Sequence, residues 1–130
     1  MKLGIKLVKI AAVYLLVGLV MGLVMGISNN FSLTSVHAHV SLLGWATMAI
    51  AGILYIMIPE CGRTRLAAAH FWGHNIGLPV MTLSLALYAY GVKAAEKTIA
   101  VGSVVVLVAL LLFVVNLLRN GRVELPDSHA

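Results

Sequence analysis

The sequence predicts an all-α integral membrane protein that folds as a single four-helix bundle, and three observations lead to this fold class. Hydrophobic residues make up 62% of the 130 positions, and charged residues only 10%. Soluble domains carry about 25% charged residues. Four apolar stretches each reach the roughly 20 residues that a transmembrane helix needs, and only short polar segments separate them. We expect one transmembrane domain over residues 1–130, with helices at 5–28, 35–58, 68–91 and 98–118 and a polar tail at 119–130.

The positions of the basic residues predict how these helices are oriented. They gather before the first expected helix, between the second and third, and after the fourth (Lys2, Lys6, Lys9; Arg63, Arg65; Arg119, Arg122). Segments rich in Lys and Arg stay in the cytoplasm. Both termini are therefore expected inside a bacterial-type inner (plasma) membrane, and the uncharged loop at 29–34 outside. The net charge of +5 is spread along membrane boundaries, which argues against a nucleic-acid partner.

The first expected helix has glycines at every fourth position, namely Gly18, Gly22 and Gly26. Small residues at this spacing line one helix face and allow another helix to approach closely in lipid. We expect this face to pack against a neighbour. Met21 and Met25 follow the same spacing, and they either fill gaps in the bundle or serve as thioether ligands to heme or copper.

Two histidines begin the second apolar stretch, His37 and His39. An ionisable residue inside a hydrophobic span is by default a candidate functional residue. Positions i and i+2 of a helix lie about 200° apart, so the two imidazoles should serve different sites on opposite faces. Gly44 and Trp45 follow, and we expect them beside a flat ligand or a neighbouring helix.

The third expected helix carries a second histidine pair, His70 and His74. Residues four positions apart share a helix face, which is a spacing that can hold a metal ion. The alternative is a pair of interfacial residues that bond a carbonyl or a lipid headgroup. This helix begins on the cytoplasmic side and the preceding one on the outer side. With spans about 30 Å long, the expected separation of the two pairs prevents them from ligating the same metal within one chain.

Several of these residues together resemble a known family. The motifs are His37-Ala-His39, Gly44-Trp45, Tyr55, Pro59, His70-Phe71-Trp72 and Ile76-Gly77. They resemble the catalytic subunit of heme-copper oxidases, and the C-type oxidase and nitric oxide reductase branches look most similar. In that family one helix carries a His-x-His whose first imidazole binds the high-spin heme and whose second binds the low-spin heme. The resemblance implies these two roles for His37 and His39.

The chain also departs from the family, because it has four expected helices rather than twelve or more and lacks the histidines that bind copper. The family's large subunit looks like three four-helix arcs around a pseudo-threefold axis. By analogy, this chain could form a homotrimer in which His37 of one copy and His39 of the next ligate heme b at each interface. No complete binuclear centre fits in one chain, and no catalytic residue is identified.

Three classes of function follow from the sequence. The first is a heme b protein that transfers electrons to or from a redox partner or binds O2 or NO, and thus a candidate oxidoreductase. The second is a copper or other metal site at the same histidines without heme. The third is a non-catalytic accessory subunit of a respiratory complex. Membrane lipid and further copies of the chain are the expected partners in each case.

Overall fold

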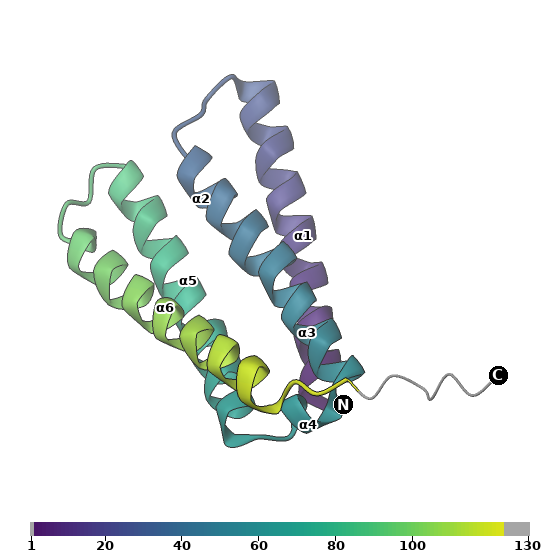
Figure 1. Ribbon diagram of the computed structural model, residues 1–130. Helices are drawn as coiled ribbons and strands as arrows, with labels where there is room; N and C mark the ends of the chain where they lie inside the picture. The colour runs from purple at the N-terminus through teal and green to yellow at the C-terminus, as the bar shows by residue number, and fades with distance from the viewer. Residues whose placement is uncertain (1, 124–130) are drawn as a thin grey trace.

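The computed structural model describes residues 2–123, and every regular element in that range is a helix (Figure 1). In chain order the elements are α1 (Lys2–Ser28), α2 (Thr34–His39), the π-helix η1 (Val40–Thr47), α3 (Met48–Met57), α4 (Pro59–Gly62), α5 (Arg65–Ala89) and α6 (Ala95–Asn120). The segments α2, η1 and α3 run without a break and form one long helix. Of the tail expected at 119–130, residues 124–130 lie outside the described range.

The all-helical class is confirmed, and three of the four expected spans are long and apolar enough to cross a membrane. The helices long and apolar enough to cross a membrane are α1, the continuous helix from Thr34 to Met57, and α6. Helix α5 is as long as these but is not among them, because His70, His74, Asn75 and Pro79 make it more polar. A membrane-spanning position for α5 therefore remains a prediction.

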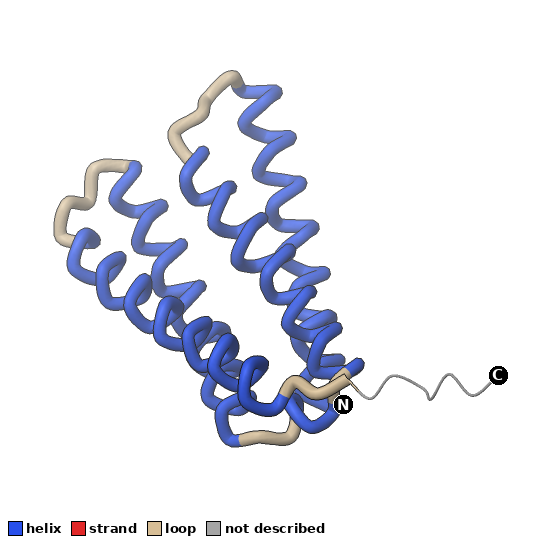
Figure 2. The backbone as a smooth tube through the Cα atoms, viewed as in Figure 1, coloured by secondary structure: helices blue, strands red, loops and turns tan. Residues whose placement is uncertain are grey.

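The helices form two hairpins that meet at α4 (Figures 1 and 2). Helix α1 packs along η1 and α3, and α5 packs along α6. The two hairpins diverge away from α4, toward the loops that connect α1 with α2 and α5 with α6. An apolar cleft of about 420 Å³ lies between them, lined from α1, from the loop before α2, from α2 and η1, and from α5.

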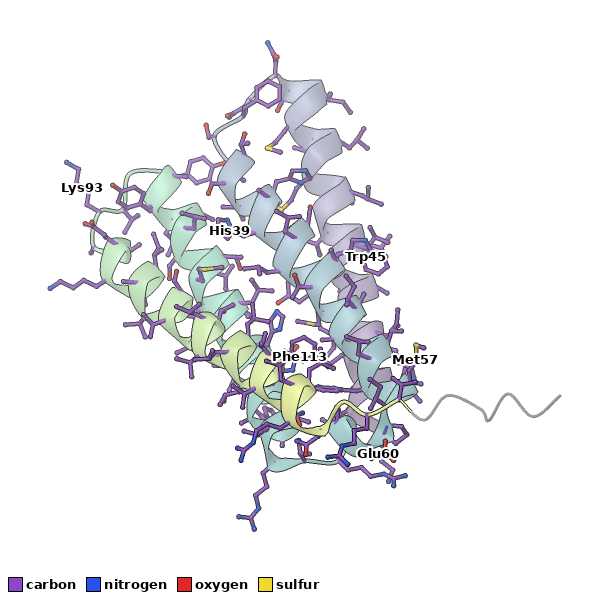
Figure 3. The ribbon with its side chains drawn as sticks, viewed as in Figure 1. His39, Trp45, Met57, Glu60, Lys93 and Phe113 are labelled. Atoms are coloured by element: carbon purple, nitrogen blue, oxygen red, sulfur yellow. The ribbon has the colours of Figure 1, made fainter. Side chains whose placement is uncertain are left out.

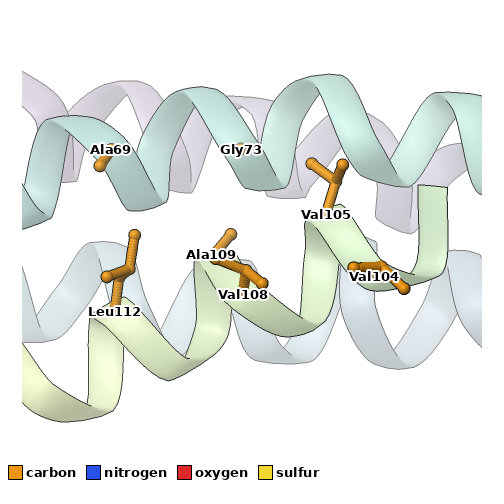
Figure 4. Close-up of a pocket in the computed structure, with 7 residues that line it drawn as sticks. All are labelled: Ala69, Gly73, Val104, Val105, Val108, Ala109 and Leu112. Atoms are coloured by element: carbon orange, nitrogen blue, oxygen red, sulfur yellow. The ribbon is translucent and has the colours of Figure 1, made fainter. Parts of the chain in front are cut away.

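Glycines hold each hairpin tightly together. A Cβ atom on Gly4 would lie 2.6 Å from the carbonyl oxygen of Gly52, so α1 and α3 touch through their backbones. In the other hairpin, a Cβ atom on Gly73 would lie 2.9 Å from Cβ of Ala109. Figure 4 shows this second contact, where only small and branched apolar side chains line a shallow groove between α5 and α6.

The expected packing face on α1 is only partly used. Gly18 lies against Ser41 of η1 and Gly22 against the ring of His37, but nothing lies within 4 Å of a Cβ atom on Gly26. The reason is that the hairpin widens toward the loop that follows Ser28. The small-residue face therefore makes two contacts rather than three.

The two ends of the bundle differ in charge. The N-terminus, α4 and the end of α6 lie together at one end, and the loop that carries Lys93 lies at the other (Figures 1 and 3). All three groups of basic residues named above thus belong to the same end. This arrangement fits a common cytoplasmic side, although the side of the membrane itself stays a prediction.

Candidate functional site: two histidine pairs around a π-helix

The imidazole of His39 is held by its own helix. Its Nδ1 lies 2.7 Å from the carbonyl oxygen of Ser35. A carbonyl oxygen only accepts, so Nδ1 carries a proton, and in the neutral ring the lone pair left for a ligand is that of Nε2. The ring borders a pocket of about 260 Å³ whose other lining residues are Ala38, Leu42 and Leu43. A neutral imidazole fixed in this way offers Nε2 as a ligand atom.

His37 lies in different surroundings, against α1. A Cβ atom on Gly22 would lie 3.2 Å from Cε1 of the ring, so the absence of a side chain there makes room for the imidazole. Nδ1 of His37 is the one buried side-chain nitrogen or oxygen in residues 2–123 that has no hydrogen-bond partner. An unsatisfied buried group of this kind costs about 1–3 kcal/mol. A ligand or metal at that nitrogen would remove the penalty.

The space beside Gly44 is filled by a side chain. A Cβ atom on Gly44 would lie 2.5 Å from the aromatic ring of Tyr14 on α1. Trp45 is half-buried and packs against the hydrophobic core. In this arrangement both residues contact neighbouring helices, and a flat ligand would have to approach the histidines from another direction.

The second histidine pair forms a hydrogen-bonded chain through the core. Tyr55 Oη lies 3.0 Å from Nδ1 of His70, Nε2 of His70 lies 3.2 Å from Nδ1 of His74, and Nε2 of His74 lies 2.9 Å from the carbonyl oxygen of Leu43. Both imidazoles are fully buried, and Tyr55 is only 1% exposed. The ring of Phe113 packs against both Tyr55 and His70.

The carbonyl of Leu43 determines the direction of every bond in this chain. Because that oxygen only accepts, Nε2 of His74 must donate and Nδ1 of His74 must accept. His70 then donates from Nε2 and accepts at Nδ1, so the hydroxyl of Tyr55 donates. Both imidazoles are neutral and hold the Nε2–H tautomer, whereas His39 holds the Nδ1–H tautomer.

The expected separation of the two histidine pairs is wrong. His74 bonds the carbonyl of Leu43, which lies four residues from His39 and lines the same pocket. Helix α5 begins at Arg65 rather than at residue 68, so His74 lies about 14 Å along it. The ring then reaches across to the neighbouring hairpin.

The proposed metal at His70 and His74 would have to replace existing bonds. Each of their four ring nitrogens already has a hydrogen-bond partner. Within residues 2–123 no group of three or more His, Cys, Asp or Glu side chains is placed to hold a metal ion. The carbonyl bond that the sequence offered as the alternative role is present for His74.

The π-helix is the feature of the site that sequence reasoning missed. Over Val40–Thr47 the backbone takes the wider i→i+5 pattern, and at its end the N–H of Met48 bonds the carbonyl of Trp45. No proline or polar run marks this segment, so composition carries no signal for it. Segments of π-helix are rare and often lie at functional sites. Here the segment begins directly after His39 and contains Leu43, whose carbonyl His74 bonds.

A separate polar cluster closes the end of the bundle near α4. Asn116 is fully buried; its Nδ2 donates to the carbonyl of Cys61, and its Oδ1 accepts from Thr64 and Asn120. Thr64 also caps α5 by accepting from the N–H of Ala67. Burial raises the pKa of the Cys61 thiol, and the nearby Glu60 carboxylate raises it further. This cluster joins α4 to α6 and leaves the thiol unreactive.

Comparison with known proteins does not place the chain in a family: no family model, curated protein or solved structure matches it.

Proposed function

We propose that this protein is an integral membrane protein that binds heme b through His39 and His37 and serves electron transfer or the binding of O2 or NO. By the distribution of basic residues, the site would lie toward the outer side of the membrane. The resemblance of the His37-Ala-His39 motif to heme-copper oxidases suggests heme as the ligand. The geometry of the two imidazoles supports it.

The orientation of His39 is the observation that carries this proposal. Its Nδ1–H is committed to the Ser35 carbonyl, and its Nε2 lone pair is free beside an apolar pocket. Metal-binding histidines are held in this way by a second partner on the other nitrogen. The apolar lining suits the faces of a porphyrin. His37 suits a second ligand, because its Nδ1 is buried and unpaired.

A heme also suits isolated imidazoles better than a bare metal ion does. The porphyrin supplies most of the nitrogen ligands, so one or two protein ligands complete the coordination of the iron. Zinc and similar ions need three or four protein ligands. When bound, the heme would supply one-electron chemistry or gas binding at its iron, while the protein residues hold it and exclude water.

The size of the pocket favours a site shared between copies. Its volume of about 260 Å³ lies below the roughly 300–1,000 Å³ of typical small-molecule sites. Leu42, which lines it, is 64% exposed. A second copy of the chain could cover this side, and a homotrimer with head-to-tail interfaces would create three equal sites. Heme stoichiometry and the mass of the detergent-extracted particle test this part of the proposal.

Absorption spectroscopy of the protein after heme-replete expression and extraction in mild detergent tests heme binding. The wild-type protein is expected to show a Soret band. His39→Ala should abolish it, and His37→Ala should change its position. Leu42→Ala is the matched control, because it alters the wall of the same pocket without removing a nitrogen, and it should keep the band.

The result also separates the candidate roles. A large shift when carbon monoxide is added to the reduced protein indicates an open iron position and gas binding, and no shift indicates electron transfer. A wild-type protein without Soret absorbance, or with copper as its metal, would overturn the proposal. An unchanged band in His39→Ala would remove His39 from the site.

A further inference from the structure

The buried chain of Tyr55, His70 and His74 ends on the backbone of the π-helix, and this contact links it to the His39 pocket. Leu43 belongs to both: its carbonyl accepts from His74, and the residue lines the pocket beside His39. Other side-chain hydrogen bonds of α5 stay within that helix. Asn75 and Thr82, for example, each donate to carbonyls of α5 itself.

Leu43 lies within the π-helix, and the i+5 partner of its carbonyl would be the N–H of Met48, the first residue of the α-helix that follows. In the π-helix a carbonyl at position i pairs with the N–H at i+5, and in the α-helix that follows it pairs with the N–H at i+4. At this change the N–H of Met48 bonds the carbonyl of Trp45. A carbonyl near such a change benefits from a donor outside the backbone ladder, since unpaired backbone groups are costly in an apolar interior. His74 supplies that donor.

We infer that His74 is a positioning residue that holds Val40–Thr47 in its π-helical form and thereby sets the pocket into which His39 offers Nε2. His70 and Tyr55 act through His74. Their hydrogen bonds hold the ring in place, while the Leu43 carbonyl itself requires the Nε2–H tautomer of His74. The part of this inference that concerns ligand binding rests on the proposed function, whereas the part that concerns the π-helix does not.

Three substitutions separate a specific hydrogen bond from general packing. His74→Leu keeps an apolar side chain in the core and removes the donor to Leu43. His74→Gln restores an N–H donor on a side chain of related length. Thr82→Val is the matched control, because Thr82 is also buried in α5 and donates to a carbonyl, but that carbonyl belongs to α5 and not to the π-helix.

The first measurement is hydrogen exchange of the amides at positions 40–48 in the heme-free protein, followed by mass spectrometry. A hydrogen bond between membrane helices contributes amounts that correspond to about 3- to 18-fold in an opening equilibrium. His74→Leu should accelerate exchange in this segment by a factor in that range. His74→Gln should recover most of the protection, and Thr82→Val should leave it unchanged.

The second measurement is the reduction potential of the heme-loaded protein. His74→Leu should shift it while the heme stays bound, and His74→Gln should bring it back toward the wild-type value. Where His74→Leu does not accumulate, Tyr55→Phe keeps the aromatic ring and removes the hydroxyl that fixes His70. It should accelerate exchange at positions 40–48 by a smaller factor than His74→Leu does, because His70 loses one of the two bonds that hold it against His74.

The outcomes distinguish this inference from the proposed function. If the wild-type protein binds no heme but exchange in His74→Leu still rises, heme binding is refuted and the role of His74 in the π-helix stands. If exchange at positions 40–48 is the same in His74→Leu as in wild type, or an equal rise occurs in Thr82→Val, the positioning role is refuted whatever the heme content. Unchanged exchange at positions 40–48 in Tyr55→Phe would refute the claim that Tyr55 acts through His74.

Discussion

Replacing Gly52 by alanine should weaken the contact between α1 and α3, and the size of the effect follows from the distances there. A Cβ atom at this position would lie 2.8 Å from the carbonyl oxygen of Gly4, 2.9 Å from Cγ2 of Val8 and 3.0 Å from Cβ of Leu7. Ordinary contact begins near 3.4 Å. The backbone of α1 would have to retreat by about 0.6 Å at Gly4, which disturbs packing along the hairpin.

Overpacking of this kind costs about 1–3 kcal/mol. The same substitution also gains up to about 1 kcal/mol from the better helix propensity of alanine. Gly26→Ala on α1 isolates that gain, because nothing lies within 4 Å of the added atom. We therefore expect Gly52→Ala to be about 1–3 kcal/mol less stable than Gly26→Ala. Gly18→Ala should fall between them, since its closest contact is the movable hydroxyl of Ser41 at 2.9 Å.

Reversible unfolding of the purified protein in mixed micelles with increasing SDS measures these differences in the free energy of unfolding. Helical content by circular dichroism confirms that each variant starts from the same fold. Equal stabilities for Gly52→Ala and Gly26→Ala would refute the close backbone contact between α1 and α3. A Gly18→Ala variant weaker than Gly52→Ala would show that the hydroxyl cannot move aside as we assume.

Three further predictions concern the polar groups. In 15N NMR of the heme-free protein, His74 should show a protonated Nε2 and His39 a protonated Nδ1; equal tautomers for the two residues would contradict the donor directions above. Cys61 should resist maleimide at neutral pH until the protein is denatured, because its thiol is buried and its pKa is raised by burial and by Glu60. Its contribution to stability should be complete below the thiol pKa of the unfolded chain and disappear as pH rises through the higher folded-state pKa, so a Cys61→Ala variant should lose less stability in alkali than wild type. Asn116→Leu should reduce the free energy of unfolding by about 1–3 kcal/mol, since it leaves a buried carbonyl of α4 without its donor, and wild-type stability in that variant would show that the cluster is dispensable.

The parts of the fold that sequence reasoning anticipated are those that local geometry determines. Apolar length predicts the helices, and four-residue spacing predicts that Gly18 and Gly22 face a neighbour. Whether Gly26 contacts a neighbouring helix depends on where the hairpin widens, and the four-residue spacing does not predict that position. The π-helix likewise follows from contacts between elements, because Val40–Thr47 reads as an ordinary apolar helix segment. The hydrogen bonds of Tyr55, His70 and His74 depend on how deep each residue lies along its own helix and on which helices are neighbours, and the spacing of residues within one helix does not determine either.

The two histidine pairs differ in how many of their ring nitrogens already have a hydrogen-bond partner, and this number decides whether a histidine can bind a further ligand. In His70 and His74 all four nitrogens have partners, so these rings can bind a further ligand only after the core has lost a hydrogen bond. In His39 only Nδ1 has a hydrogen-bond partner, so Nε2 is the nitrogen that would bind a metal under the proposed function. Leu43 accepts a hydrogen bond from His74 and lines the pocket beside His39. The fully hydrogen-bonded pair can therefore act as a fixed support for the pocket of His39. The bundle thus contains two fully hydrogen-bonded imidazoles, His70 and His74, and two with an unpaired ring nitrogen, His37 and His39, and only the second pair is proposed to bind a ligand.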